Sequence, residues 1–241
     1  MDPDLHLQHL RTEAAALLAA TVAAPHAPVP ACPEWDRSGL LTHTGVVHSW
    51  VRLQLATGPG ERKTFRDAPR PPEGDELFPW FEENATALAD ALAGMDTTVD
   101  WPSWAGPQPA SWFKRRMAQE TAVHRWDAVP SPFDPDLAVD GIDEMLQVFV
   151  PRFPGEQVAP IAGTIHLHAT DEGLVEAGEW LITIGPDGIT HTRGHLKGDA
   201  ALRGTASDLL LWIWNRAPVD GRFEVIGDDA LVRGWADVVR I

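Results

Sequence analysis

The hydrophobic pattern changes its period part-way along this chain of 241 residues, and that change constrains the fold more than any other feature. Up to about residue 128, apolar side chains recur at the spacing of helices, whereas residues 165–192 contain short runs that alternate in the manner of strands. The two patterns meet near the proline-rich segment 130–135. The chain is therefore predicted to form a helical domain over residues 1–130 and a small α+β domain over residues 131–241.

Helix start and stop signals predict four helices in the first domain. A proline-rich stretch ends the first helix, Asp36 can cap the free amides of the second, and Gly58 and Gly94 follow the second and third. The predicted ranges are 3–24, 37–57, 75–92 and 109–128. Helices joined in this way suggest an antiparallel four-helix bundle, in which sites are commonly built from side chains of facing helices.

The second domain is predicted to mix strands and helices. The turn sequence Gly185-Pro186-Asp187-Gly188 separates two of the alternating segments. Strands are expected at 165–169, 180–184, 189–192 and 223–226, and helices at 139–153, 205–216 and 229–238.

Composition limits the partners of the chain. The chain has 35 acidic and 19 basic residues and a formal charge of -16, which disfavours nucleic acid as a partner. The lone cysteine, Cys32, cannot form an internal disulfide, which fits a reducing compartment, and no apolar run is long enough to cross a membrane. We expect a cytoplasmic monomer or homodimer that acts on small molecules, without a membrane partner.

Glu120 and His124 carry the strongest indication of chemistry. Side chains at i and i+4 share a helix face, so this pair can hold one metal ion, although the same spacing also occurs in plain surface pairs. His43 and His48 on the second predicted helix are rival third ligands. They lie roughly 140° apart around a helix, so both cannot easily face one ion.

Six segments together resemble the mycothiol-dependent maleylpyruvate isomerase family. The most specific are Pro-Ala-Cys-Pro-Glu-Trp-Asp at 30–36, Leu-Leu-Thr-His-Thr-Gly-Val-Val-His at 40–48 and Arg-Arg-Met-Ala-Gln-Glu-Thr-Ala-Val-His-Arg-Trp-Asp-Ala at 115–128. Shorter matches lie at 140–144, 167–171 and 203–209. The resemblance extends over nearly the whole chain.

The resemblance implies a fold and a metal site. It implies a DinB-like four-helix bundle followed by a sterol-carrier-like α+β domain. It also implies a divalent metal, usually zinc, held by His43, Glu120 and His124, with one coordination position left open, as in catalytic zinc sites. The chain departs from the family at Gln119, where a histidine is expected before the ligand glutamate.

The implied cosubstrate is mycothiol, a low-molecular-weight thiol. A metal with an open position lowers the pKa of a thiol, and the thiolate adds to the conjugated double bond of maleylpyruvate. Rotation about the resulting single bond and elimination then give the trans isomer. The same thiolate could be transferred to a small electrophile instead. Two further alternatives are a non-catalytic protein that binds an apolar ligand around a structural metal, and a metal hydrolase that needs no thiol.

Three further side chains are candidates near such a site. Arg116, one turn before Glu120, suits a substrate carboxylate or the thiol cosubstrate, or forms an ordinary helix ion pair. Asp127 could orient a ligating histidine or pair locally. The resemblance suggests a functional arginine in the second domain, for which Arg216 is the choice, although an arginine at a helix C-terminus is also favourable electrostatics.

His166 and His168 alternate along a predicted strand and so share a face. Two histidines on one face permit metal binding, but no third ligand is evident nearby in the sequence. They are therefore a weak metal-site prediction.

Overall fold

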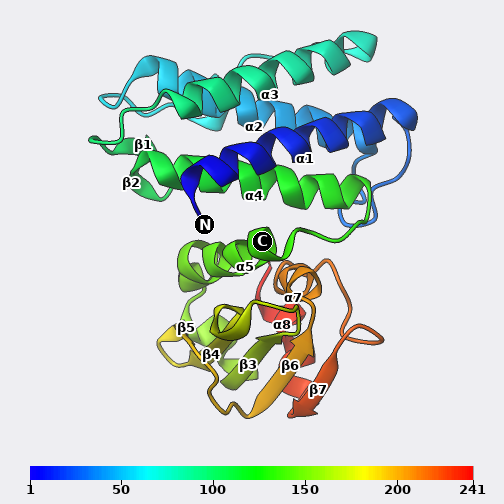
Figure 1. Cartoon of the computed structure of the whole chain (residues 1–241), viewed down its shortest axis with the longest axis vertical. Helices are drawn as coiled ribbons and strands as arrows, with labels where there is room; N and C mark the ends of the chain where they lie inside the picture. Colours follow the sequence, from blue (N-terminus) through cyan, green and yellow to red (C-terminus); the bar gives the residue numbers. More distant parts are fainter. Residues whose placement is uncertain (241) are drawn as a thin grey trace. The chain divides into compact units, whose positions relative to one another are not determined.

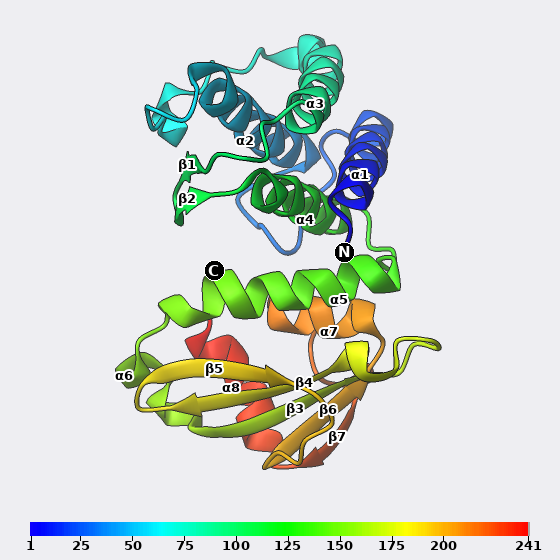
Figure 2. The same cartoon turned by 60° about the vertical axis from the view of Figure 1, so that its left-hand side comes forward.

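The chain folds into two compact units, one from Met1 to Ser131 and one that begins at Pro132. The structure is a computed structural model and describes residues 1–240. The first unit is helical and the second contains a mixed β-sheet, as predicted (Figures 1 and 2). None of the helices within the described residues is both long enough and apolar enough to span a membrane.

The four predicted helices of the first unit are present. Their side-chain caps explain where two of them begin, because Asp2 accepts a hydrogen bond from the amide of Asp4 and Asp36 accepts one from Gly39 at 2.8 Å. The third begins at Leu77 instead of residue 75, because Gly74–Glu76 forms a 3-10 turn. The helices are α1 (Pro3–Ala23), α2 (Arg37–Thr57), α3 (Leu77–Ala93) and α4 (Ala110–Ala128).

The prediction of an antiparallel bundle is wrong for two neighbouring pairs, because α1 and α4 run parallel to each other, as do α2 and α3. Ser38 and Phe78, near the start of each helix, line one cavity, and Ala56 and Ala91, near the end of each, line another. Figure 1 shows α1 and α4 running one way and α2 and α3 the other. The connection 58–76 makes this possible. Helix α2 has 21 residues and is about 32 Å long, and residues 58–76 can span more than this distance when extended, so the chain can return along the helix.

Apolar side chains from all four helices fill the interior of the bundle. The fully buried ones include Leu10, Leu17, Leu40, Leu41, Phe81, Leu88, Leu92 and Ala122. At Gly45 the backbone of α2 passes so close to α3 that an added Cβ would lie 2.4 Å from the Trp80 ring. A glycine is needed there for this helix pair to pack as it does.

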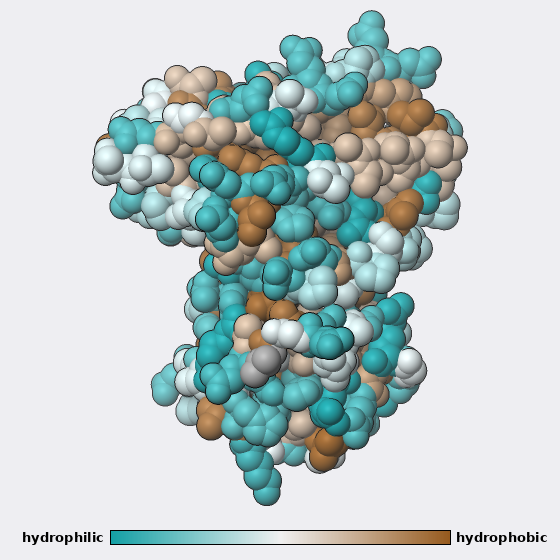
Figure 3. Space-filling model, in the orientation of Figure 1, coloured by the Kyte–Doolittle hydropathy of each residue, from teal (hydrophilic) through white to brown (hydrophobic). Residues whose placement is uncertain are grey.

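Two features of the bundle were not predicted. A short hairpin, β1 (Trp101–Ser103) with β2 (Gly106–Gln108), joins α3 to α4. In addition, α1 and α3 leave an apolar groove of about 610 Å³ between them. Figure 3 shows brown and tan atoms over this side of the bundle. The groove is lined mainly by Ala14, Ala15, Leu18, Val22, Phe81 and Ala85.

The second unit is built on a five-stranded sheet with the order β5-β4-β3-β6-β7. Only the β3–β6 pair is parallel. The four predicted strands are present, whereas β6 was not predicted. The strands are β3 (Gly163–Ala169), β4 (Glu179–Gly185), β5 (Gly188–Arg193), β6 (Ala200–Gly204) and β7 (Glu224–Gly227).

Helices pack on one face of this sheet. The indole nitrogen of Trp180 on β4 donates to Asp143 at 2.9 Å, and the rings of Trp212 and Trp235 lie 5.0 Å apart. These contacts join the sheet to α5 (Pro135–Glu144) and join α7 (Ala206–Ile213) to α8 (Asp229–Val238). The short α6 (Gly155–Val158) precedes β3.

Two helix boundaries differ from the prediction. The first helix of this unit begins at Pro135 instead of residue 139, because Asp134 caps it by accepting from the amide of Leu137. The helix predicted over 205–216 ends at Ile213. Asn215 takes a left-handed conformation with φ of 57°, and the amide of Arg216 donates to Leu211, a pattern that closes helix C-termini. Arg216 therefore lies beyond the helix.

Candidate metal centre

The bundle brings His43, on α2, together with Glu120 and His124, on α4. The Nε2 atom of His124 lies 3.3 Å from Oε1 of Glu120, and Nε2 of His43 lies 3.6 Å from the same oxygen. One donor atom from each residue falls within 4.8 Å of the others. All three are partly enclosed, with side-chain exposures of 30% for His43, 20% for Glu120 and 11% for His124.

These three side chains fit a divalent metal ion. Two ligands of a tetrahedral zinc ion with bonds of 2.0–2.1 Å lie roughly 3.3 Å apart, close to the two nitrogen–oxygen distances of the site. Two imidazole nitrogens and one carboxylate oxygen are also a donor set that zinc accepts. The ligand set that the resemblance implies is thus geometrically able to hold the ion.

Glu120 and His124 form an ion pair. Burial raises the pKa of Glu120, but hydrogen bonds with His124 and His43 and the charge of Arg116 outweigh it and hold the pKa well below its usual range. Burial lowers the pKa of His124, but hydrogen bonds with Asp127 and Glu120 reverse the effect and raise it to about 9. A metal ion would have to displace the proton that His124 carries at neutral pH.

Asp127 and Arg116 each contact one member of the trio. The carboxylate of Asp127 lies 3.1 Å from Nδ1 of His124, which leaves Nε2 facing Glu120. Arg116 donates to Oε2 of Glu120 at 2.6 Å, and its side chain is only 4% exposed. Arg116 therefore forms the helix ion pair that the spacing allowed, in a buried setting. Its predicted contact with a substrate or cosubstrate stays a prediction.

The rival ligand His48 faces elsewhere. Its Nε2 lies 2.9 Å from the hydroxyl of Thr121, and its ring packs near Phe81. Burial lowers its pKa to about 4, so the imidazole is neutral. The geometry favours His43 over His48 as the ligand from α2.

Two aromatic side chains beside His43 were not predicted as site residues. Trp35 stacks on the imidazole with ring centroids 4.7 Å apart, and Phe65 lies 6.3 Å away. Phe65 belongs to a 3-10 turn (Phe65–Asp67) in the long connection between α2 and α3. Trp35 lies in the Pro-Glu-Trp-Asp motif, but no spacing rule assigns it to a histidine, and nothing in the sequence pairs Phe65 with His43.

Two other arginines have local partners. Arg125 is buried and donates to Glu13 on α1 and to the carbonyl of Ser131 at 2.9 Å, so it joins two helices. Arg216 donates to the carbonyl of Trp214 at 2.9 Å and lines a cavity of about 370 Å³ within the second unit. Its predicted catalytic role stays a prediction.

Sequence comparison accounts for both units. Residues 7–129 match the mycothiol maleylpyruvate isomerase N-terminal domain, and residues 136–234 match the C-terminal domain of the same family. The chain belongs to this family. The family resemblance read from the motifs is thereby confirmed, and with it the prediction of an enzyme related to these isomerases. A search of curated proteins gave no significant match.

Solved structures support the fold of a family member. A histidine-to-alanine variant of the mycothiol-dependent maleylpyruvate isomerase superposes with a TM-score of 0.64 at 12% identity. The unmodified isomerase superposes with a TM-score of 0.60 at 13% identity. Each comparison covers 93% of both chains. At this identity the likeness establishes the two-domain fold and leaves the reaction to be tested.

Proposed function

We propose that this family member is a zinc-dependent, or other divalent-metal-dependent, enzyme that uses mycothiol to isomerise maleylpyruvate or a similar small electrophile. The observation that carries the proposal is the convergence of His43, Glu120 and His124 from two helices on one point. Three protein ligands suit a catalytic metal, because a fourth position stays available for a small molecule. Membership of a family named for this reaction supports the choice of thiol and substrate.

The metal would supply one kind of chemistry: it would lower the pKa of a thiol that enters its open position. Other side chains of the protein would orient the three residues that bind the metal. Asp127 holds Nδ1 of His124, so that Nε2, once deprotonated, would be the nitrogen that binds the ion. Arg116 holds one oxygen of Glu120, which leaves the other oxygen for the ion. Trp35 stacks on His43 and fixes the plane of that ring.

The remaining candidate residues of the site are Arg116, Asp127 and Arg216. Arg116 is a positioning residue for Glu120 and gives the site a positive charge that would attract the carboxylates of the substrate or thiol. Asp127 is a positioning residue for His124, whose Nδ1 it contacts. Arg216 is the proposed substrate-binding residue of the second unit, beside its cavity of about 370 Å³.

The test begins with the metal content of the purified protein and of Glu120→Ala, measured by elemental analysis. We expect Glu120→Ala to contain about one zinc ion per chain fewer than the unmodified protein and to lose mycothiol-dependent isomerase activity. Glu83→Ala is the control, because Glu83 is an exposed carboxylate of the same bundle. A variant Glu120→Ala that keeps both its metal and its activity would contradict the proposal.

Isomerisation and thiol transfer differ in the fate of the thiol. Isomerisation releases mycothiol unchanged at each turnover, whereas transfer consumes one thiol for each molecule of electrophile. Measuring free thiol during turnover therefore separates the two reactions. Turnover that continues after the thiol has been removed would support a thiol-independent hydrolase instead.

A further inference from the structure

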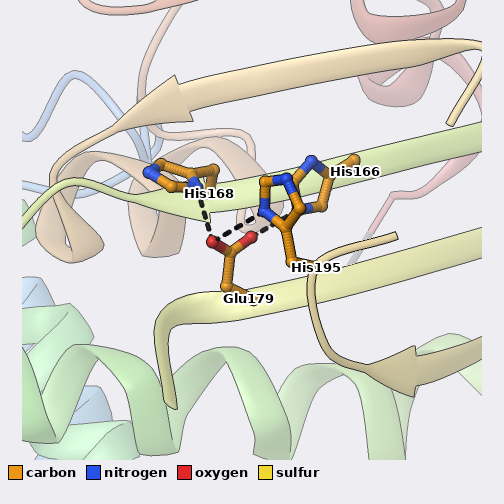
Figure 4. Close-up of side chains that lie close together, drawn as sticks. All are labelled: His166, His168, Glu179 and His195. Atoms are coloured by element: carbon orange, nitrogen blue, oxygen red, sulfur yellow. Dashed lines mark hydrogen bonds and ion pairs between the residues drawn. The ribbon is translucent and has the colours of Figure 1, made fainter. Parts of the chain in front are cut away.

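Three histidines and one glutamate meet on the sheet of the second unit. His166 and His168 lie on β3, Glu179 begins β4, and His195 follows the end of β5. The two β3 histidines share a face, and Glu179 is the direct cross-strand partner of His168 on that face. Figure 4 shows the three imidazoles gathered around the Glu179 carboxylate.

Two side chains of the cluster are buried, and the other two are more exposed to solvent. Neighbouring side chains such as Leu167 and Trp180 are buried on the opposite face, where Trp180 bonds to α5. The side chains of His166 and Glu179 are each only 8% exposed, that of His168 is 24% exposed and that of His195 is 76% exposed. Polar groups buried to this degree require partners, and here the imidazoles and the carboxylate supply them to one another.

Each histidine directs a ring nitrogen at the one carboxylate. Nδ1 of His168 lies 2.6 Å from Oε1 of Glu179, and Nδ1 of His195 lies 3.1 Å from the same oxygen. Nε2 of His166 is hydrogen-bonded to Oε2. Four donor atoms, one from each residue, all fall within 4.8 Å of one another.

The Glu179 carboxylate gives the cluster a negative charge, and the nearest basic side chains do not neutralise it. Burial raises the pKa of Glu179, but hydrogen bonds from His195 and His166 outweigh it, so the carboxylate is ionised at neutral pH. Arg203 on β6 is paired in register with His168, but its guanidinium donates to Glu224 at 2.6 Å. Lys197, two residues after His195, is exposed.

We propose that His166, His168, Glu179 and His195 form a second divalent-metal site, which takes a transition metal of the Zn²⁺ class. Three imidazole nitrogens and one carboxylate oxygen suit such ions better than Mg²⁺ or Ca²⁺, which prefer oxygen ligands. Four protein ligands complete a tetrahedral shell, which is the pattern of structural sites. The ion would tie the segment after β5 to β3 and β4. The fold brings Glu179 and His195 to His166 and His168, which the sequence alone did not indicate.

Only small movements are needed to admit the ion. Tetrahedral ligands lie roughly 3.3 Å apart, so His168 and His195 would each move away from Glu179 by less than about 1 Å. His195 has room to do so, since its side chain is 76% exposed. The ion replaces the hydrogen bonds that the imidazoles now make with the carboxylate.

Zinc titration of the full chain, freed of metal by a chelator and followed by calorimetry, tests this site. We expect two equivalents to bind, and we expect His195→Ala to weaken one of them by about tenfold or more, since it removes one of four ligands. The exposure of His195 makes this variant safe for folding. Glu179→Gln should abolish the same equivalent, because it removes the charge and keeps the shape of the side chain.

Two variants complete the design. His191→Ala removes a histidine of the same sheet outside the cluster and should keep both equivalents. Glu120→Ala should remove only the equivalent assigned to the bundle. Binding of a single equivalent that disappears in Glu120→Ala, or unchanged binding in both His195→Ala and Glu179→Gln, would overturn the second site. Zinc lost in His195→Ala but unaffected by Glu120→Ala would support this site and contradict the proposed function.

Discussion

His124, a ligand of the proposed metal site, lies between two carboxylates. Asp127 and Glu120 lie on either side of its ring, at 3.1 Å from Nδ1 and 3.3 Å from Nε2. These carboxylates favour the protonated imidazole in the metal-free protein, and they favour a cation of any kind at the same place. At the proposed site, the proton and the metal would therefore compete for one nitrogen.

This competition predicts a pH dependence of zinc binding. Because the pKa of His124 is raised to about 9, it is protonated at pH 7, and zinc affinity should rise roughly tenfold per pH unit as the pH approaches that value. Calorimetry at pH 7.0 and 8.5 would measure the rise and the released proton. In Asp127→Asn the pKa of His124 falls, so the dependence should flatten. Equal affinity at both pH values would contradict this account.

At the scale of elements, α1 and α4 are joined by a buried ion pair. The side chains of Glu13 and Arg125 are only 10% and 5% exposed, and Arg125 also donates to the Ser131 carbonyl. An uncompensated charge inside a protein is costly, so the pair holds only while both partners are present. This contact fixes the helix that carries Glu120 and His124 against its neighbour.

Removing one partner is expected to destabilise the bundle. Glu13→Ala should lower the free energy of unfolding by about 3 kcal/mol, because it leaves Arg125 charged and buried. Denaturant unfolding monitored by helical circular dichroism measures the loss. The exposed pair Arg11–Asp90 is the control, and Asp90→Ala should cost less than about 1 kcal/mol. A double variant, Glu13→Leu with Arg125→Met, should regain much of the loss, and failure to do so would argue against this explanation.

The elements that sequence predicted best are those with local signals. Asp36 and the helical period located α2, and the turn at Gly185–Gly188 located β4 and β5. Strand β6 was not predicted, because Ala200–Gly204 is rich in alanine and glycine, which have little preference for strands. The hairpin β1–β2 was not predicted, because each strand has only three residues and contains a proline.

The candidate sites divide in the same way. The pair Glu120 and His124 could be predicted from spacing within one helix, whereas His43 required the family motif. His195 could not be predicted, because it meets His166 only through the pairing of β3, β4 and β5, and strand register depends on contacts that are distant in the sequence.

At the scale of the whole molecule, two units with separate cores predict more than one thermal transition. Units of about 130 and 110 residues each bury enough apolar surface to fold cooperatively. We expect calorimetry to show two transitions and a chelator to lower the bundle transition by more than about 4 °C. Glu120→Ala, measured without chelator, identifies that transition. A single transition whose temperature changes neither with the chelator nor in Glu120→Ala would contradict this view.

The long return from α2 to α3 has a consequence for how such enzymes diversify. This connection places Phe65 beside His43, on a segment outside the packed faces of the bundle. Mutations there can reshape the space around the proposed metal site while the helices that carry His43, Glu120 and His124 keep their sequence. Mutations in this connection can therefore change the substrate preference with little loss of folding stability.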